Sequence, residues 1–266
     1  MKKEKIDVVY HGCESLKYID FSIALTLKYI PWVSTIHIIY DDYELAATDL
    51  PLHNSSKKVK YLPLSSFLPR KYKDSRKNSC VVESWLWNSK EIADLFIYFC
   101  NDMFVGQPMC SCKFFAPDGK PIVRILPESP DHSMEASRIP YVKMWQNAIS
   151  KHGIHYTRIS HCALPYKKSL LKKYYSKWSE EVNRASWNKQ RAGAKDFNLL
   201  RIGTALMIME GDAFMEVTHT DYFTESGDSA NVRSILKMRP PLFCINNLDE
   251  EKPVVKSMLT KYVSML

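Results

Sequence analysis

The sequence predicts an α/β fold with a mostly parallel sheet, and three observations support this class. Residues 95–99, Leu-Phe-Ile-Tyr-Phe, form an uninterrupted apolar and aromatic run, which is typical of a strand buried on both faces. A second apolar run at 6–10 is followed by a helical pattern over 16–30 and by another apolar run at 35–40. A strand, a helix and a strand within about 35 residues predict a βαβ unit, whose two strands are parallel.

The remaining elements of the amino-terminal half follow from spacing and from breaker residues. In 16–30, apolar residues recur every three or four positions, as on the buried side of a helix, and Pro31 ends the pattern. Residues 57–64 predict a short edge strand, because Pro63 cannot donate a hydrogen bond to a neighbouring strand. A helix over 80–93 is expected to lead into the strand at 95–99.

The carboxyl-terminal half predicts mainly helices that cover this sheet. Short segments punctuated by proline between Gly106 and Pro140 indicate an insertion rich in strands or loops. The tail at 254–266 is amphipathic, and we expect it to dock on its own domain rather than on a membrane. Helices are expected at 142–152, 166–185 and 198–209, and strands at 214–223 and 241–247.

Composition limits the classes of partner and the compartment. The formal charge of +8 favours polyanionic partners, such as nucleotide sugars, lipid phosphates or an anionic membrane surface, and no nucleic-acid motif is present. Neither a signal peptide nor a membrane span is recognisable, so we expect a cytoplasmic chain that is at most peripheral at the inner face of the membrane. Seven cysteines without a secretion signal predict reduced thiols, and the spacing of Cys110 and Cys112 does not fit a zinc ribbon.

Polar residues interrupt the apolar runs where the predicted strands end. Because parallel strands bring their carboxyl ends to one edge of a sheet, these side chains are candidates for lining one cleft. Asp102 follows the most apolar strand, where a carboxylate can hold a divalent cation that in turn holds a diphosphate. Each of these residues alone could equally cap a turn. The set is Asp7, Asp41, Asp42, Asn101, Asp102, Asn246 and Asn247.

Two further residues are candidates for catalysis on their chemistry. His161 precedes a lysine-rich segment, and its imidazole could take a proton from an attacking hydroxyl while the neighbouring cations hold phosphate oxygens. Arg191 offers a guanidinium fork that suits a phosphoryl group in transfer. A single histidine or arginine is more often structural, so spacing alone leaves both alternatives open.

Four blocks of the chain, in order, resemble the Stealth family of sugar-1-phosphate transferases. The second block is the most specific, because Val82-Glu83-Ser84 and the stretch from Phe96 to Pro108 are similar to the family pattern I-E-S followed by F-I-Y-x-N-D-D-M-F-x-G-x-P. The first block lies in 6–41 and the third begins at His161 and includes Arg191. The fourth is Phe243-Cys244-Ile245-Asn246-Asn247, which resembles C-L-N-D.

The chain departs from the family pattern at two carboxylates. Asn101 stands where the family has the first Asp of Asn-Asp-Asp, and Asn247 stands where an Asp is usual. Fewer carboxylates imply a weaker or different metal site, and a changed donor or reaction becomes conceivable.

The resemblance implies a GT-A-like, Rossmann-like fold and a single catalytic domain over 1–266. In this arrangement 1–110 is the nucleotide-binding half, and 111–266 is an insertion followed by a helical half on the acceptor side. The implied reaction moves a sugar-1-phosphate from a nucleotide diphosphate sugar to a hydroxyl of a glycan or lipid-linked glycan, as in the synthesis of capsule and other surface polysaccharides.

The resemblance also implies roles for individual residues. Catalysis would rest on Asp102, His161 and Arg191, with His161 as the general base. Mg²⁺ or Mn²⁺ would be bound by Asp102, Asn101 and Asn246. The substrate would be contacted by Asp7, Tyr10, Asp41, Glu83, Lys168, Asp196, Asn198 and Asn247.

Two other functions remain open from the sequence. A metal-dependent GT-A-type glycosyltransferase would use the same cleft but attack the anomeric carbon and release a nucleoside diphosphate. A catalytically impaired homologue that only binds a glycan would explain the missing carboxylates.

Overall fold

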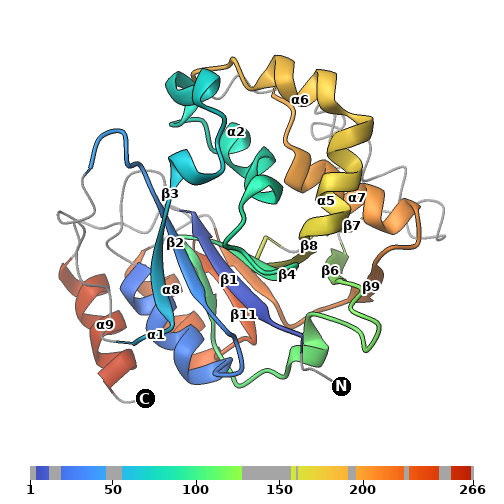
Figure 1. The fold of residues 1–266 in the computed structure, drawn as a ribbon. Helices are drawn as coiled ribbons and strands as arrows, with labels where there is room; N and C mark the ends of the chain where they lie inside the picture. The colour runs from blue at the N-terminus through green and yellow to red at the C-terminus, as the bar shows by residue number, and fades with distance from the viewer. Residues whose placement is uncertain are drawn as a thin grey trace.

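The computed structural model places a five-stranded sheet at the centre of the molecule, with helices on both faces (Figure 1). Its strand order is β3-β2-β1-β4-β8. The strands are β1 (Ile6–His11), β2 (Ile36–Tyr40), β3 (Val59–Pro63), β4 (Leu95–Cys100) and β8 (Leu164–Lys167). The structure describes residues 4–11, 19–45, 56–127, 157–159, 161–190, 196–224, 228–245 and 253–264.

The predicted α/β class with a mostly parallel sheet is confirmed. The first four strands of the order are mutually parallel, and β8 adds to β4 in the antiparallel direction. The chain leaves β1 toward β2 and β3 on one side and returns to β4 on the other. An open α/β sheet binds its ligands where the strand order reverses in this way, beyond the carboxyl ends of the two central strands. Here those ends are His11 of β1 and Cys100 of β4, which pair with each other.

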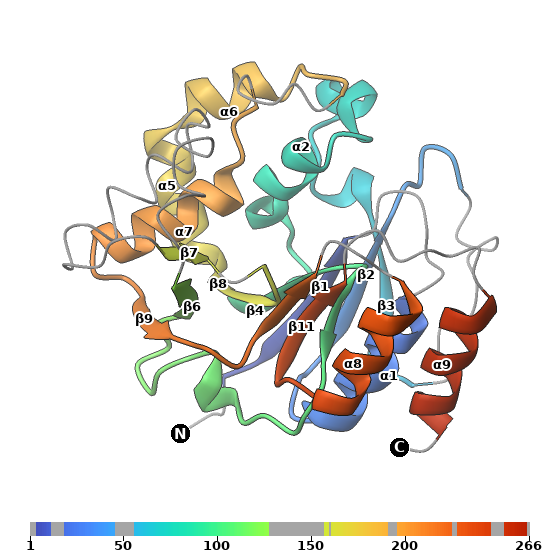
Figure 2. The same ribbon diagram turned by 180° about the vertical axis from the view of Figure 1, so that it is seen from behind.

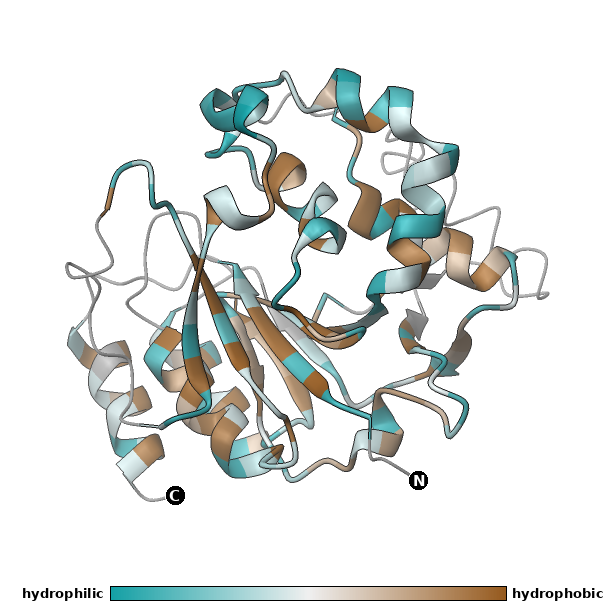
Figure 3. Cartoon of the chain, in the orientation of Figure 1, coloured by the Kyte–Doolittle hydropathy of each residue, from teal (hydrophilic) through white to brown (hydrophobic). Residues whose placement is uncertain are grey.

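Alternation along β4 explains why both faces of the sheet carry helices. Leu95, Ile97 and Phe99 belong to one apolar cluster, whereas Phe96 and Tyr98 belong to another on the opposite face. Two clusters of buried apolar residues lie on opposite faces of the sheet. Hydrophobic residues colour much of the central strands in Figure 3. The interpretation of 95–99 as a doubly buried strand is therefore correct.

The helices divide between the two faces (Figures 1 and 2). The first face is covered by α1 (Ile19–Tyr29), α8 (Ser229–Met238) and α9 (Pro253–Ser264). The second face is covered by α2 (Ser79–Ser84), α5 (Lys168–Lys177), α6 (Ser179–Ala185) and α7 (Leu199–Met209). The amphipathic tail helix docks on its own domain as predicted, because Val255, Leu259 and Tyr262 are buried in the first cluster.

Two small sheets flank the main one. One has the order β10-β11-β5 and the other β7-β6-β9. Their strands are β5 (Met103–Val105), β6 (Ile122–Pro127), β7 (Thr157–Ile159), β9 (Phe214–Val217), β10 (Tyr222–Thr224) and β11 (Leu242–Ile245). Gly106 follows β5 where a Cβ atom would overlap the carbonyl oxygen of Pro240, so only glycine allows this approach of β5 to β11.

Several boundaries differ from the predictions. The helix expected over 80–93 ends at Ser84, and a short 3₁₀ turn at Leu86–Asn88 follows it. The helix expected over 166–185 begins only after β8 and breaks between α5 and α6 at Trp178, which has a non-helical backbone. The strand expected over 214–223 is two strands, and α8 was not predicted. The helix expected at 142–152 lies outside the described residues.

The carboxyl-terminal half does more than cover the sheet, because it supplies β8 as a fifth strand.

The prediction that all the cysteines are reduced is wrong at one pair. Cys110 and Cys112 form a disulfide, with their Cα atoms 5.2 Å apart, a separation that a disulfide spans readily. Within the described residues, no helix is long and apolar enough to cross a membrane.

Candidate functional site

The turn between β4 and β5 lies beyond the carboxyl end of the central strand and carries Asn101 and Asp102. The backbone carbonyl of Asp102 accepts a hydrogen bond of 3.0 Å from the Ile245 amide, which ties the turn to β11. In the described structure, the Asp102 Oδ1 atom is buried and has no hydrogen-bond partner. A buried oxygen without a partner is costly, and it marks a position where a cation or a ligand donor would be stabilised.

Asp102 meets two other potential ligands at this turn. One carboxylate oxygen of Asp102, one ring nitrogen of His161 and the sulfur of Cys244 all lie within 4.8 Å of one another. Cys244 comes from β11, where it pairs with Met103 across the ladder to β5. His161 precedes β8, whose antiparallel register with β4 pairs Leu164 with Tyr98 and so starts the strand near the carboxyl end of β4. The structure therefore brings together Asp102 and His161, two of the residues that the sequence predicted to be catalytic.

Burial controls the protonation of the thiols around Asp102. Desolvation raises the pKa of the Cys244 thiol well above its ordinary value, and the negative charge of Asp102 raises it further. The pKa of Cys100 is also raised, chiefly by burial and then by the charges of Glu83 and Asp102. Both thiols are therefore neutral at physiological pH while no cation is bound to them.

Glu83 forms a buried polar network beside the strand end. Its carboxylate accepts a hydrogen bond of 2.8 Å from the Tyr98 hydroxyl and another from the Asn198 side-chain amide. His11 Nδ1 lies 4.0 Å from the same carboxylate. The positive charge of Arg201, on α7, also reaches this region. It lowers the pKa of Cys100, although burial raises that pKa by more. Two predicted site residues, Glu83 and Asn198, thus lie together between α2, α7 and the sheet.

The predicted ligand set for Mg²⁺ or Mn²⁺ is only partly matched. The partnerless Asp102 oxygen fits a divalent cation of either kind. However, the groups that face it are an imidazole nitrogen and a thiol sulfur, and Mg²⁺ favours oxygen ligands. Asn246, the third predicted ligand, lies outside the described residues.

Two predicted substrate contacts, Tyr10 and Asp7, lie away from the cleft. Tyr10 is fully buried, and its hydroxyl is within hydrogen-bond distance of Ser22 and Thr26 of α1, so it is a core residue. Asp7 stands near the amino end of β1, opposite the cleft, where its carboxylate accepts hydrogen bonds from the backbone of Thr35 and Ala93. The prediction that Tyr10 and Asp7 contact the substrate is therefore wrong for the described structure.

Lys168 also lies at the wrong end of the sheet for a substrate contact. Its ammonium group donates to the carbonyls of Ser89 and Ile92, in the loop that precedes β4. Burial lowers the pKa of Lys168. Lys168 lies at this end because β8 starts near the carboxyl end of β4 and runs antiparallel to it, toward its amino end. Lys168 is therefore not one of the cations that were predicted to hold phosphate oxygens beside His161.

Asp41 and Asp196 are already engaged with other side chains. Asp41 follows β2 at the correct end of the sheet, but its carboxylate accepts a hydrogen bond of 2.7 Å from the Arg76 guanidinium. Asp196 accepts hydrogen bonds from the side-chain amides of Asn78 and Asn188. Both residues support the loops around the cleft in this structure. Arg191 and Asn247 lie outside the described residues, so their roles stay predictions.

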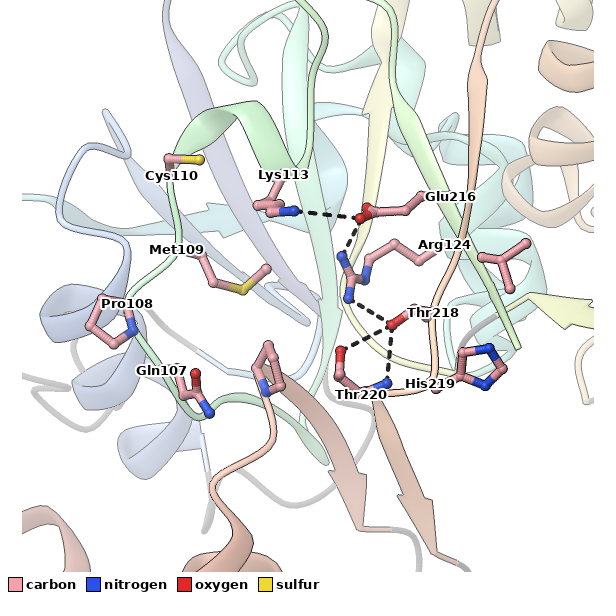
Figure 4. A pocket seen from close by; sticks show the side chains of 12 residues that line it. Gln107, Pro108, Met109, Cys110, Lys113, Arg124, Glu216, Thr218, His219 and Thr220 are labelled. Atoms are coloured by element: carbon pink, nitrogen blue, oxygen red, sulfur yellow. Dashed lines mark hydrogen bonds and ion pairs between the residues drawn. The ribbon is translucent and has the colours of Figure 1, made fainter. Parts of the chain in front are cut away.

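A cavity of about 580 Å³ opens at the other end of the β10-β11-β5 sheet (Figure 4). Arg124 of β6 forms one wall, and its guanidinium donates to Asp221 at 2.7 and 2.8 Å, to Glu216 at 3.0 Å and to Thr218. Lys113 Nζ also lies 3.5 Å from the Glu216 carboxylate. The remaining lining residues are Gln107, Pro108, Met109, Cys110, Val217, His219, Thr220 and Pro241.

Sequence reasoning missed the role of two residues at the strand end. Cys244 was part of the fourth block, but nothing in its spacing indicated that its sulfur faces Asp102. Arg201 lies within a helix whose other residues are mainly apolar, and this isolated charge was the only signal for it. Cys244 reaches Asp102, and Arg201 reaches the region of Cys100, only because the fold brings together segments that are far apart along the chain.

Comparison with known proteins supports the resemblance. Residues 10–123 match the family described as Stealth protein CR2, conserved region 2. A capsular polysaccharide phosphotransferase of Haemophilus influenzae is 26% identical over 250 residues, which cover 85% of this chain and 65% of that protein. A protein of the same description from Neisseria meningitidis serogroup B is 26% identical over 242 residues, covering 85% and 64%. The chain thus spans slightly less than two thirds of the length of these curated relatives.

Among solved structures, the galactosyltransferase LgtC, in complex with donor and acceptor sugar analogs, aligns with a TM-score of 0.49 and 10% sequence identity. The alignment covers 98% of this chain and 96% of that structure.

Proposed function

This chain is a relative of the Stealth phosphotransferases, and from that premise we propose that it transfers a sugar-1-phosphate from a nucleotide diphosphate sugar to an acceptor hydroxyl. The observation that supports this proposal most directly is the juxtaposition of Asp102 and His161 beyond the carboxyl end of β4. An imidazole can take the proton of the attacking hydroxyl, and a carboxylate oxygen without a partner can hold a cation that stabilises charge on the phosphoryl oxygens, so the pair suits this reaction.

The proposed reaction forms one bond and breaks one bond at the same phosphorus. The acceptor oxygen attacks the phosphorus proximal to the sugar, and the bond from this phosphorus to the bridging oxygen breaks. The products are a sugar phosphodiester and a nucleoside monophosphate. When bound, a divalent cation would neutralise charge on the diphosphate and on the leaving group.

The residues of the chain take separate parts in this reaction. His161 accepts the proton of the acceptor hydroxyl, because it stands at the cleft beside a carboxylate that can stabilise the imidazolium. Asp102 would hold a divalent cation through its Oδ1 atom, which has no hydrogen-bond partner in the described structure. The family pattern assigns the neutralisation of charge on the phosphoryl oxygens to Arg191, and Arg201 of α7 supplies a second guanidinium near the strand end.

The acceptor is proposed from the relatives and from charge. The two relatives described above are named for capsular polysaccharide, so we propose a glycan or lipid-linked glycan as the acceptor. The net charge of +8 suits an anionic donor and a peripheral contact with the inner face of the membrane.

The proposal is tested by incubating the chain with a panel of nucleotide sugars, a glycan acceptor and Mg²⁺ or Mn²⁺, and by identifying the nucleotide released. Release of a nucleoside monophosphate that depends on the acceptor is expected. Release of a nucleoside diphosphate would identify a glycosyltransferase instead. Donor binding without any turnover would identify a binding homologue.

A further inference from the structure

We infer that the Asp102, His161 and Cys244 cluster is a site for a thiophilic divalent cation of the Zn²⁺ class, which competes with the catalytic use of His161. This inference deepens the proposed function, because it concerns the same cleft and names an ion that regulates it.

The ligand atoms are an oxygen, a nitrogen and a sulfur within 4.8 Å of one another. Zn²⁺ is bound in proteins by carboxylate, imidazole and thiolate groups at about 2.0–2.3 Å, so small side-chain rotations would bring all three onto one ion. Mg²⁺ rarely takes sulfur or nitrogen ligands, and its sites consist mainly of oxygen. The mixed set therefore discriminates against Mg²⁺, one of the two cations that the sequence predicted.

A second observation points independently to a ligand at this position. The Asp102 Oδ1 atom is buried and lacks a hydrogen-bond partner in the described structure. A positively charged ion beside it would compensate the cost of burying this oxygen. The partnerless atom belongs to the residue that shares the cluster with the imidazole and the thiol.

The three groups are also held on a rigid frame. Cys244 lies on β11, which is paired with β5 immediately after Asp102. The Ile245 amide donates to the Asp102 carbonyl, which fixes the turn relative to the thiol. His161 lies in a bend shortly before β8, which is paired with β4. Because Cys244 lies on a strand, and Asp102 and His161 lie close to strand ends, the sheets limit how far the three ligands have to move when an ion binds.

Binding would exchange protons for the ion. The Cys244 sulfur lies within 4.8 Å of an Asp102 carboxylate oxygen, and burial raises the pKa of the thiol, so it carries its proton while no ion is bound. When the ion binds, the sulfur–metal bond forms, and the thiol proton is released to the solvent. The ring nitrogen of His161 donates its lone pair to the same ion, so this nitrogen cannot then accept a proton from an acceptor hydroxyl. Occupancy by a thiophilic ion and general-base action at this nitrogen therefore exclude each other.

The experiment measures metal binding directly, on the whole chain without donor or acceptor. Wild-type protein is titrated with Co²⁺, a spectroscopic substitute for Zn²⁺, and the near-ultraviolet thiolate-to-cobalt charge-transfer band is recorded. Zn²⁺ affinity is measured in parallel by competition with a chelator, and Mg²⁺ serves as the comparison ion.

Two cysteine variants identify the sulfur ligand. Cys244→Ser keeps the size of the side chain and a hydrogen-bond donor, but it removes the thiolate. Cys162→Ala is the matched control, because Cys162 is equally buried beside His161, and its thiol donates to the Tyr222 carbonyl at 3.7 Å. We expect the band in wild type and in Cys162→Ala and its loss in Cys244→Ser, with Zn²⁺ affinity lowered at least about tenfold. Circular dichroism of each variant establishes that it is folded.

Two results would overturn the inference. The first is the absence of a thiolate band in folded wild-type protein. The second is an unchanged Zn²⁺ affinity in folded Cys244→Ser. Because binding is measured without substrates, a failure of sugar-phosphate transfer leaves this result intact. Conversely, transfer activity in a protein that shows no thiolate band would reject the inference and retain the proposed function. Where transfer is observed, we also expect Zn²⁺ to slow it and a chelator to restore it.

Discussion

Asp102 is the residue on which the site depends most. Its Oδ1 atom is buried without a partner, so the folded chain gains little from the charge when no ligand is present. We therefore expect Asp102→Asn to reduce transfer by at least about 100-fold. Its melting temperature should change by less than about 3 °C, which corresponds to about 1 kcal/mol in a chain of this size.

The matched control for this variant is Asp118→Asn, which changes an exposed carboxylate in a turn that precedes β6. It should leave both transfer and melting temperature unchanged. If Asp102→Asn kept wild-type activity, Asp102 would have no part in the reaction. Activity assays and thermal melts on the two variants distinguish these outcomes.

His161 is predicted to govern the pH dependence of the reaction. A general base must be unprotonated, so the rate should rise between about pH 5.5 and 7.5, where imidazoles ordinarily titrate. His161→Gln should lower the rate by about 10²–10⁴-fold and remove this rise. The measurement is a pH profile of both proteins in chelator-treated buffer. A lower melting temperature with an unchanged shape of the profile would instead make His161 a structural residue.

At the residue scale, the sequence pointed to Asp102 because it follows the most apolar strand, and to His161 because it precedes a lysine-rich segment and opens the third family block. The structure places these two side chains close together, and their catalytic roles stay predictions. Tyr10 was misassigned because a tyrosine hydroxyl that reaches Ser22 and Thr26 inside the core cannot be distinguished, by sequence, from one that reaches a ligand.

At the scale of elements, the direction of a strand decided which predictions failed. Nothing in the sequence from Leu164 to Lys167 shows that β8 runs antiparallel to β4 and carries Lys168 away from the cleft. Periodicity likewise predicted one helix over 166–185, because it cannot detect the change of backbone at Trp178. Strand pairing and helix breaks depend on contacts between distant segments, so short windows of sequence do not contain them.

Arg124 links β6 to the segment that follows β9 through its ion pair with Asp221. Removal of Arg124 therefore tests how much this ion pair contributes to stability. The guanidinium and the Asp221 carboxylate are almost completely buried, so removal of the arginine would leave a buried charge without its partner. We expect Arg124→Met to lower the free energy of unfolding by about 3–5 kcal/mol, as measured by urea denaturation.

Lys113→Met provides the comparison for this prediction, because Lys113 pairs with the same Glu216 at 3.5 Å but is about half exposed. Its removal should change the free energy of unfolding by less than about 0.5 kcal/mol. Equal losses in the two variants would contradict the assignment of Arg124 as the buried cation of this sheet.

At the scale of the whole molecule, the strand order explains why the site forms where it does. The reversal between β1 and β4 opens the sheet at the carboxyl ends of these strands, and α2 and α7 bring Glu83 and Asn198 to the same place. The sequence predicted the parallel core, since apolar runs separated by a helix specify it. It predicted a strand at 241–247 near the cleft, but it did not predict that β8, from the carboxyl-terminal half, joins the main sheet beside β4.

The fate of the sugar-proximal phosphorus tests the central claim most directly. Donor labelled at that phosphorus is incubated with acceptor and the wild-type chain, and the products are separated. Sugar-1-phosphate transfer predicts that the label appears in the acceptor as a phosphodiester, with Asp102→Asn abolishing its incorporation. Recovery of all the label in a released nucleoside diphosphate would contradict the account, because it would place the attack at the anomeric carbon.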